Sequence, residues 1–397
     1  MNARINHMAT RTHADAASGL EELLSESPEA AERRAAARFT LEDADALALY
    51  GAGQLGRHVL ARLRAQGVEP TAFADDTPSK QGTSVDGLPV VSPREFAERF
   101  GERAVFAVTI FNPAASFLRV SRALGEQTSA RVVSFLELAW KYPEALLPHY
   151  QFEPPQQVLA KGASIRRAFQ LFADEESRRQ FVAHLRFRLH LDFEALPPSN
   201  LGDYFPEGVV PELPADATFV DCGAFDGDTV RRFVERQRGR FGAVYAFEPD
   251  AENFRRLSEY AATLGAEAAG RIHLFRAAVG ARRGRLRFDS NAGMASALSD
   301  EGSEEVDVMP VREVVPADGA NTLFMKFDVE GTESDALEGA AELVGLARAH
   351  TAVCVYHRPD DLWSLPTRLR ELAPHHRLFL RTQGEDGMDV VCYAIPS

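Results

Sequence analysis

The chain has 397 residues, of which 45% are hydrophobic, and a formal net charge of −14. This length exceeds one usual hydrophobic core, so we expect two compact domains with connecting helices. The apolar runs fall short of the roughly 20 residues that cross a bilayer, and the acidic balance repels phosphate backbones and anionic lipid, so we expect no membrane span and no nucleic-acid partner.

The N-terminal segment and the cysteines give no sign of secretion. Residues 1–40 are rich in Ala, Glu and Arg and lack the apolar stretch and cleavage site of a signal peptide. We therefore expect a helical leader on a cytoplasmic protein. Cys222, Cys354 and Cys392 are widely spaced within apolar runs, which favours buried thiols over a disulfide framework or a zinc site.

Residues 41–150 alternate between short apolar runs and helix-like stretches. Such alternation is typical of strands joined by helical crossovers. It predicts a small Rossmann-like domain with a parallel sheet. The expected strands are 46–50, 71–76, 88–91, 104–110 and 132–135.

A glycine pattern follows the first of these strands. Gly51, Gly53 and Gly56 open a helix, and Asp75 lies about twenty residues further on, which is the full context of a dinucleotide site. We therefore predict a nucleotide site at Gly51, Gly53, Gly56 and Asp75. No catalytic Lys, Tyr or His set accompanies it, so binding without chemistry is the preferred interpretation. The alternative is a domain that only packs or dimerises.

Residues 151–213 form an expected helical bridge, with a helical pattern at 174–191. Proline-rich segments follow at 196–200 and 203–206. Because they lead directly into the last domain, we expect this part of the bridge to cover a site there.

Residues 214–397 again alternate between apolar runs and helix-like stretches. The last two runs, 377–381 and 389–394, are separated by a short turn and must form an antiparallel hairpin. The chain is thus predicted to be an α/β protein with two Rossmann-like parallel-sheet domains, the second ending in an antiparallel hairpin. The other strands expected in the second domain are 218–222, 243–248, 272–277, 322–328 and 352–357.

The first strand of this domain ends in an acidic glycine loop. Gly223 and Gly227 allow a ligand to lie against the backbone, and Glu248 is placed to bind ribose hydroxyls. The loop is not G-x-G-x-x-G, and its opening Asp221 would crowd a pyrophosphate while suiting the cationic methionine part of S-adenosylmethionine. The alternative is an ordinary tight turn with a capping Asp.

A second group of charged residues is expected over the same crevice. Lys326, Asp328 and Glu330 lie at the end of the strand 322–328, where paired charges are costly without a purpose. His357 ends the next strand, and its ordinary pKa near roughly 6.5 suits proton transfer. We interpret these four residues as catalytic candidates, with His357 or Asp328 as the base and Glu330 and Lys326 orienting the site. A structural histidine is the alternative.

Together these motifs resemble the FkbM family of methyltransferases. They are D-x-G-A-x-x-G-D-T from Asp221, F-E-P-D around Glu248 with Asn253, K-x-D-V-E-G-x-E from Lys326, and His357, over roughly residues 200–397. The resemblance implies a class I methyltransferase fold, S-adenosylmethionine as methyl donor, and O-methylation of a hydroxyl on a small-molecule acceptor such as a sugar, a glycan precursor or a secondary metabolite. By position it assigns cofactor contacts to Asp221, Gly223, Ala224, Gly227, Thr229, Glu248, Asn253 and Ala278.

Several alternatives stay open. The N-terminal domain also resembles the nucleotide-sugar-binding domain of some sugar acetyltransferases, so its ligand could be NAD(P), a nucleotide sugar or none. An NAD(P)-linked oxidoreductase or a non-catalytic nucleotide-binding regulator are the other function classes. A divalent ion held by acidic residues could acidify the hydroxyl, but no decisive ligand set stands out, so no metal ligands are assigned. The sequence does not decide between a monomer and a homo-oligomer.

Overall fold

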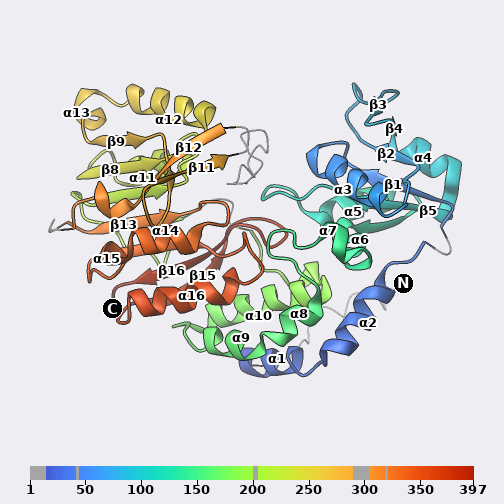
Figure 1. Ribbon diagram of the computed structural model, residues 1–397, viewed down its shortest axis with the longest axis horizontal. Coiled ribbons are helices and arrows are strands. Elements are labelled where there is room, and N and C mark those ends of the chain that lie inside the picture. The colour runs from blue at the N-terminus through green and yellow to red at the C-terminus, as the bar shows by residue number, and fades with distance from the viewer. Residues whose placement is uncertain (1–14, 42–43, 200–203, 289–303, 318–320) are drawn as a thin grey trace, which may run out of the picture.

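The computed structural model describes residues 15–41, 44–199, 204–288, 304–317 and 321–397. Residues 1–14 of the expected leader and 200–203 of the expected bridge lie outside the described residues. Figure 1 shows two sheet-containing domains on the left and right, joined below by a layer of helices.

The N-terminal domain contains a six-stranded sheet in the order β3-β4-β2-β1-β5-β6. All its pairs are parallel except β3 with β4. The central strand β1 is buried along its whole length, as expected for a parallel strand covered on both faces. The strands are β1 (Ala46–Tyr50), β2 (Ala72–Ala74), β3 (Ser84–Val85), β4 (Leu88–Val91), β5 (Ala104–Val108) and β6 (Arg131–Ser134).

Five helices accompany this sheet. Ser134 ends β6 and caps the next helix by accepting a hydrogen bond from the Leu136 amide, so Phe135, expected in a strand, begins α6. The helices are α3 (Gln54–Ala65), α4 (Pro93–Phe100), α5 (Phe117–Gln127), α6 (Phe135–Lys141) and α7 (Pro143–Leu146).

The helical layer joins the two domains. Its longest helix, α10, begins where Asp174 accepts a hydrogen bond from the Ser177 amide and ends where Leu191 takes a left-handed conformation. In α1 the buried Leu20 and Leu23 pack into the same core as the C-terminal domain, so this part of the leader is docked. The layer comprises α1 (Ala16–Leu23), α2 (Pro28–Arg38), α8 (Pro155–Ala160), α9 (Gly162–Phe169) and α10 (Glu175–His190).

The C-terminal domain is built on a seven-stranded sheet in the order β15-β16-β14-β13-β7-β8-β9. The expected hairpin is confirmed: β16 runs antiparallel to β15 and to β14, and the other pairs are parallel. Both domains therefore have the predicted α/β, parallel-dominated architecture. The strands are β7 (Thr218–Cys222), β8 (Ala243–Phe247), β9 (Ile272–Phe275), β13 (Leu323–Phe327), β14 (Ala349–Cys354), β15 (Arg377–Thr382) and β16 (Val390–Ile395).

A second, three-stranded sheet in this domain was not predicted. It has the order β10-β12-β11 and consists of β10 (Ala278–Val279), β11 (Gly284–Phe288) and β12 (Glu304–Met309).

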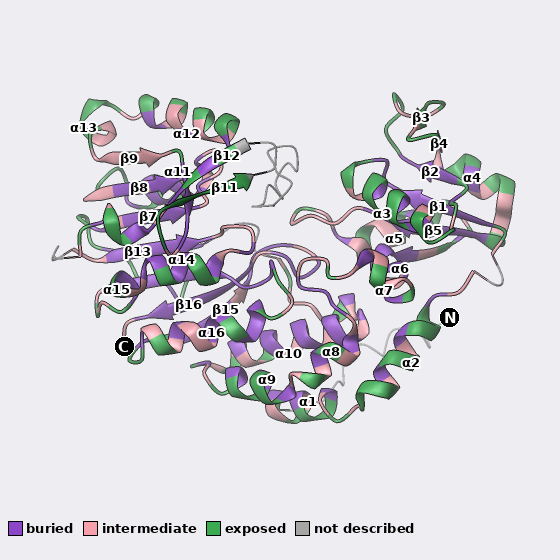
Figure 2. Cartoon of the chain, viewed as in Figure 1, coloured by how far each residue is buried: buried purple, intermediate pink, exposed green. Residues whose placement is uncertain are grey.

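Figure 2 shows the central strands of both large sheets buried and the outer helix faces exposed. None of the described helices has the length and apolar character needed to cross a membrane. The domain's helices are α11 (Asp228–Arg236), α12 (Ala251–Thr263), α13 (Ala266–Ala269), α14 (Glu333–Gly339), α15 (Ala341–Val344) and α16 (Asp361–Leu372).

Candidate active site

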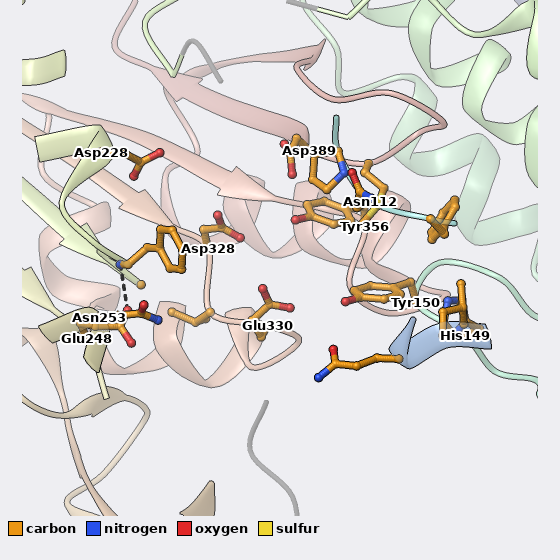
Figure 3. A pocket seen from close by; sticks show the side chains of 18 of the residues that line it. Asn112, His149, Tyr150, Asp228, Glu248, Asn253, Asp328, Glu330, Tyr356 and Asp389 are labelled. Carbon is orange, nitrogen blue, oxygen red and sulfur yellow. Dashed lines mark hydrogen bonds between the residues drawn. The ribbon is translucent and has the colours of Figure 1, made fainter. Parts of the chain in front are cut away.

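One cavity of about 1040 Å³ is lined by both domains. Figure 3 shows Glu248 and Asn253 at one end, Asp328 and Glu330 in the middle, and Tyr150 with His149 at the other end. The two predicted sites thus open into a single space. The sequence-predicted residues that line it are Gly51, Gly53, Asp75, Gly223, Thr229, Glu248, Asn253, Ala278, Lys326, Asp328 and Glu330, whereas Gly56, Asp221, Ala224, Gly227 and His357 do not.

The loop after β7 is shaped by two glycines with positive φ. A Cβ atom on Gly223 (φ 83°) would lie 1.8 Å from the Asp328 carbonyl oxygen, so no other residue fits there. A Cβ atom on Gly227 (φ 87°) would lie 2.9 Å from Leu257 Cδ1 in α12. The loop is therefore pressed between the end of β13 and α12, which leaves its cavity side open.

Beneath this loop lies a buried ion pair. Lys326 Nζ donates to Asp221 Oδ1 at 3.0 Å and to the Gly223 carbonyl oxygen at 2.7 Å. Burial raises the pKa of Asp221 to about 6, although the charge of Lys326 opposes the shift. Asp221 was predicted to contact the cofactor, but its carboxyl group turns inward, so it acts on the loop through Lys326.

Glu248 follows β8 and grips the same loop from the other side. Its Oε2 accepts a hydrogen bond from the Phe225 amide and its Oε1 one from the Asp250 amide, each at 2.8 Å. Burial raises the pKa of Glu248 to about 7, while these amides oppose the shift. Because a carboxylate has about four lone-pair sites, Glu248 can still accept hydrogen bonds from a ribose.

The remaining cofactor candidates lie around Glu248. Asn253 stands in the first turn of α12, where Asp250 caps the helix, and lines the cavity. Thr229 and Ala278 line it from α11 and β10, and both are buried. Ala224 is fully buried behind the loop, where its amide donates to the Phe247 carbonyl oxygen at 2.9 Å.

Asp328 directly follows β13 and is held by groups from three segments of the chain. Its Oδ2 accepts a hydrogen bond from the Tyr204 hydroxyl at 2.9 Å and lies 3.8 Å from Lys326 Nζ. His357 Nε2 lies 3.4 Å from its Oδ1. Despite burial, the positive charges of Lys326 and His357 keep the pKa of Asp328 below its usual value. Asp328 is therefore an ionised carboxylate facing the cavity.

His357 is surrounded by carboxyl groups. Its Nδ1 lies 2.7 Å from Glu333 Oε1, and its Nε2 lies 3.6 Å from Glu330 Oε2. Although burial opposes protonation, Glu333 and Glu330 raise the pKa of His357 to about 10. His357 does not line the cavity, and its raised pKa favours the protonated form, so of the two expected bases Asp328 is the better placed.

Glu330 projects into the cavity from a strained backbone position with φ 54°. Burial, and then the neighbouring carboxyl groups, raise its pKa to about 8, although His357 opposes the shift. Left-handed backbone at a non-glycine residue costs free energy and is concentrated at functional sites. Asp328, Glu330 and the neighbouring Asp389 are thus carboxyl groups of this cluster that line the cavity.

Three residues of the site were missed by sequence reasoning. Tyr204 belongs to the proline-rich segment that was expected to cover the site, but its contact with Asp328 was not foreseen. Glu333 was not assigned a role, yet its carboxyl group accepts the Val329 amide and faces His357. Tyr150, also with positive φ, stacks on Tyr356 with ring centroids 6.4 Å apart. Partners so distant in sequence leave no local signal.

The N-terminal part of the cavity is formed by the turn between β1 and α3. A Cβ atom on Gly56 would lie 2.1 Å from the Gly51 carbonyl oxygen, so Gly56 serves close packing of α3 against β1. No atom lies within 4 Å of a Cβ atom built on Gly53. Asp75 Oδ2 accepts from the Ala52 amide at 3.0 Å and from Lys80 Nζ at 2.8 Å.

Comparison with known proteins gives a family match within the C-terminal half of the chain. Residues 221–386 match the family model of the methyltransferase FkbM domain. The crystal structure of methyltransferase FkbM from Methylobacillus flagellatus KT has a TM-score of 0.74 and 22% identity, covering 96% of this chain and 98% of that chain. At this identity the likeness shows the fold, and it extends over both domains.

Other solved structures are much less similar. A putative rRNA methylase from Clostridium thermocellum has a TM-score of 0.30 and 14% identity over 47% of this chain and 89% of that chain. A SAM-dependent methyltransferase from Aquifex aeolicus has a TM-score of 0.26 and 12% identity, covering 46% of this chain and 84% of that chain. Curated protein sequences give no match. The family model, together with the fold, identifies residues 221–386 of this chain as a methyltransferase FkbM domain.

Proposed function

We propose that this chain is an S-adenosylmethionine-dependent methyltransferase that methylates a hydroxyl group on a sugar, a glycan precursor or a secondary metabolite. The observation that carries the proposal is the placement of two carboxyl groups, Asp328 and Glu330, beside the Gly223 loop in one cavity. This arrangement offers a cofactor cradle and groups that can receive the hydroxyl proton within the same space.

The cofactor would lie over the Gly223 loop. Glu248 accepts the ribose hydroxyls, and Asn253 and Ala278 line the adenine end, since all three line the same wall of the cavity. The acidic surroundings attract the sulfonium cation. Lys326 and Asp221 keep the loop in place from below.

Methyl transfer is an in-line displacement. The acceptor oxygen forms a bond to the methyl carbon, the bond from carbon to sulfur breaks, and its electron pair stays on sulfur to give a neutral thioether. The hydroxyl proton passes to the Asp328 and Glu330 carboxyl cluster. Most of the rate enhancement comes from holding oxygen and methyl carbon in line.

The acceptor would extend toward the N-terminal domain. Beyond Glu330 the cavity is lined by the Tyr150 and Tyr356 rings, which suit the face of a sugar or another flat, partly apolar group. Further on lie Gly53, Lys80 and Asp75 of the predicted nucleotide site. Ligand pockets measure about 300–1,000 Å³, and a cavity of about 1040 Å³ leaves room for acceptor beside cofactor. We therefore assign the N-terminal domain to acceptor binding.

Calorimetric titration of the full chain with S-adenosylhomocysteine, NADH and UDP tests this function against its alternatives. Binding of S-adenosylhomocysteine, followed by transfer of radiolabelled methyl from S-adenosylmethionine to a sugar or metabolite library, supports the proposal. Binding of NADH without S-adenosylhomocysteine favours the oxidoreductase. Binding of S-adenosylhomocysteine with no methyl transfer to any acceptor favours a regulator.

A further inference from the structure

Tyr204 places a buried hydroxyl group within an apolar core. The residue is 7% exposed, lines the cavity and packs in the hydrophobic core of the C-terminal domain together with Phe205. Burying a hydroxyl group costs free energy unless it is hydrogen-bonded. A phenylalanine would fill the same space without that cost, so the Tyr204 hydroxyl group requires a reason other than packing.

The hydroxyl group links a thiol to the Asp328 carboxylate. It donates to Asp328 Oδ2 at 2.9 Å and lies 3.3 Å from Cys354 Sγ. Because a hydroxyl group has one proton, the Cys354 thiol must donate the second of these bonds to the tyrosine oxygen. Burial raises the pKa of Cys354 well above its usual range, which keeps that proton on sulfur. Each bond in such a chain strengthens the next, and the chain ends on Asp328.

This bond reaches the carboxylate oxygen that an acceptor can meet. Asp328 Oδ1 is buried and faces His357 Nε2 at 3.4 Å, whereas the Asp328 side chain as a whole is 24% exposed and lines the cavity. An acceptor hydroxyl in the cavity therefore meets Oδ2. A carboxylate has about four lone-pair sites on its two oxygens, so with one site on Oδ2 taken by Tyr204 the other is left for the acceptor proton.

The contact of Lys326 with Asp328 is longer than that of Tyr204. Lys326 Nζ lies 3.8 Å from Asp328 Oδ2 and is engaged by Asp221 and the Gly223 carbonyl oxygen. A charge at that distance attracts the carboxylate but lacks the direction of a hydrogen bond, so it does not fix the carboxylate's rotation. The Tyr204 ring lies 5.1 Å from Lys326 Nζ, and this ring contact does not depend on the hydroxyl group.

We propose that Tyr204 is a positioning residue for the proton transfer, whose hydroxyl group fixes the Asp328 carboxylate with a free lone pair of Oδ2 toward the acceptor hydroxyl. During methyl transfer the acceptor proton passes to Oδ2 as the acceptor oxygen forms its bond to the methyl carbon, and the carboxylate becomes a carboxylic acid. Misplacing a reacting group by about 1 Å can cost about a hundredfold in rate. The kinetic role rests on the proposed methyl transfer, whereas the orientation of Asp328 by Tyr204 does not.

A double-mutant cycle tests the kinetic role, using the full chain, S-adenosylmethionine with a radiolabelled methyl group and an acceptor from the library. Tyr204→Phe removes only the hydroxyl group. We expect kcat to fall about tenfold, while KM for both substrates and S-adenosylhomocysteine affinity stay within about twofold. In the Asp328→Asn background the same change should lower kcat by less than about twofold further, because Tyr204 acts through the carboxylate.

Tyr393→Phe is the matched control. Tyr393 is a second buried tyrosine of the same domain, whose hydroxyl group accepts a hydrogen bond from Gln383 Nε2 at 3.0 Å, and its variant should keep the wild-type rate. An unchanged kcat in Tyr204→Phe, or losses that multiply in the double variant, would overturn the kinetic role. Weakened S-adenosylhomocysteine binding in Tyr204→Phe would instead assign the hydroxyl group to the cofactor site.

Crystal structures of wild-type protein and Tyr204→Phe give a readout that needs no acceptor. We expect the Asp328 carboxyl group to be rotated, or to occupy two orientations, in Tyr204→Phe but not in Tyr393→Phe. The wild-type orientation in Tyr204→Phe would show that Tyr204 does not position Asp328, even if methyl transfer is found. Absence of methyl transfer by wild-type protein would contradict the proposed function, and the two structures would still decide whether Tyr204 orients the carboxylate.

Discussion

In both sheet domains a carboxyl group holds the first glycine turn, but the pKa of that carboxyl group is shifted in opposite directions. In each domain, an acidic residue at the end of the neighbouring parallel strand accepts a hydrogen bond from a backbone amide of the turn. Asp75, after β2, accepts one from the Ala52 amide, and Glu248, after β8, accepts one from the Phe225 amide. Asp75 also accepts a hydrogen bond from Lys80 Nζ. Burial raises the pKa of Asp75, but this hydrogen bond and those from Thr77 and Ala52 outweigh it and lower the pKa to about 2. Burial raises that of Glu248 to about 7.

This difference follows from what surrounds each carboxyl group. Lys80 is half-exposed and reaches Asp75 from the adjacent loop, so the N-terminal turn carries a balanced charge pair. Lys326, whose charge acts on Glu248, is already engaged by Asp221 and the Gly223 carbonyl oxygen. A shared fold therefore gives one turn whose carboxylate is paired with a lysine and one whose carboxyl group is held by backbone amides, and the ligand of each domain cannot be inferred from its glycine pattern alone.

The largest expected effect comes from adding a methyl group to each turn. Gly223→Ala should destabilise the C-terminal domain by more than about 3 kcal/mol, because the new Cβ atom would meet the Asp328 carbonyl oxygen at 1.8 Å. Gly53→Ala should change stability by less than about 1 kcal/mol, since its φ is −97° and its Cβ atom meets nothing within 4 Å. Urea unfolding followed by tryptophan fluorescence measures both, and equal losses would contradict the packing difference.

The next effect separates chemistry from binding. Asp328→Asn should lower the rate of methyl transfer about a hundredfold, or about 2.7 kcal/mol, because a carboxylate beside the acceptor is lost. S-adenosylhomocysteine affinity should stay within a few-fold, since Asp328 is held mainly by Tyr204 and Lys326. Asp335→Asn, on the exposed face of α14, is the matched control. A large loss of cofactor affinity in Asp328→Asn would place this residue in the cofactor site instead.

How far the sequence leads is clearest at these residues. Glycine spacing and strand alternation reveal both sheets, the terminal hairpin and the C-terminal family, because these signals are local. The alternation does not reveal β10 to β12, since β10 has only two residues and two of the five residues of β11 are arginines. Nor does it show that Asp221 faces Lys326, 105 positions away, or that Glu333 faces His357. Motif residues are found, but which of them face the ligand depends on tertiary contacts.

Replacing in turn Glu248 and Asp75, the two carboxyl groups that hold the glycine turns, should show which domain binds S-adenosylhomocysteine. Glu248→Ala should weaken S-adenosylhomocysteine binding at least about tenfold, because the ribose acceptor and the Phe225 amide contact are both lost. Asp75→Ala should leave that affinity unchanged, since Asp75 lies in the other domain. Calorimetry on both variants measures this, and an equal loss in Asp75→Ala would show that the two turns act as one site.

The smallest effect is a pH dependence confined to one turn. Because burial raises the pKa of Glu248 to about 7, the empty site holds a proton that a ribose-binding carboxylate must release, so S-adenosylhomocysteine affinity should rise between pH 6 and 8, by about tenfold at most. The charges of Asp250 and Lys326 also act on Glu248. The first raises its pKa and the second lowers it, and burial has a larger effect than either.

The same shift has a consequence for stability with a defined sign. Between about pH 4.5 and 7 the unfolded chain releases the Glu248 proton while the folded chain keeps it, so this group's contribution to stability falls as pH rises through that interval. Glu248→Gln should flatten both the affinity and the stability profiles. The N-terminal turn should show neither dependence, because Asp75, with a pKa of about 2, is ionised throughout. A profile that persists in Glu248→Gln would assign the titration to another group, with the Asp221 and Lys326 pair beneath the loop as the next to substitute.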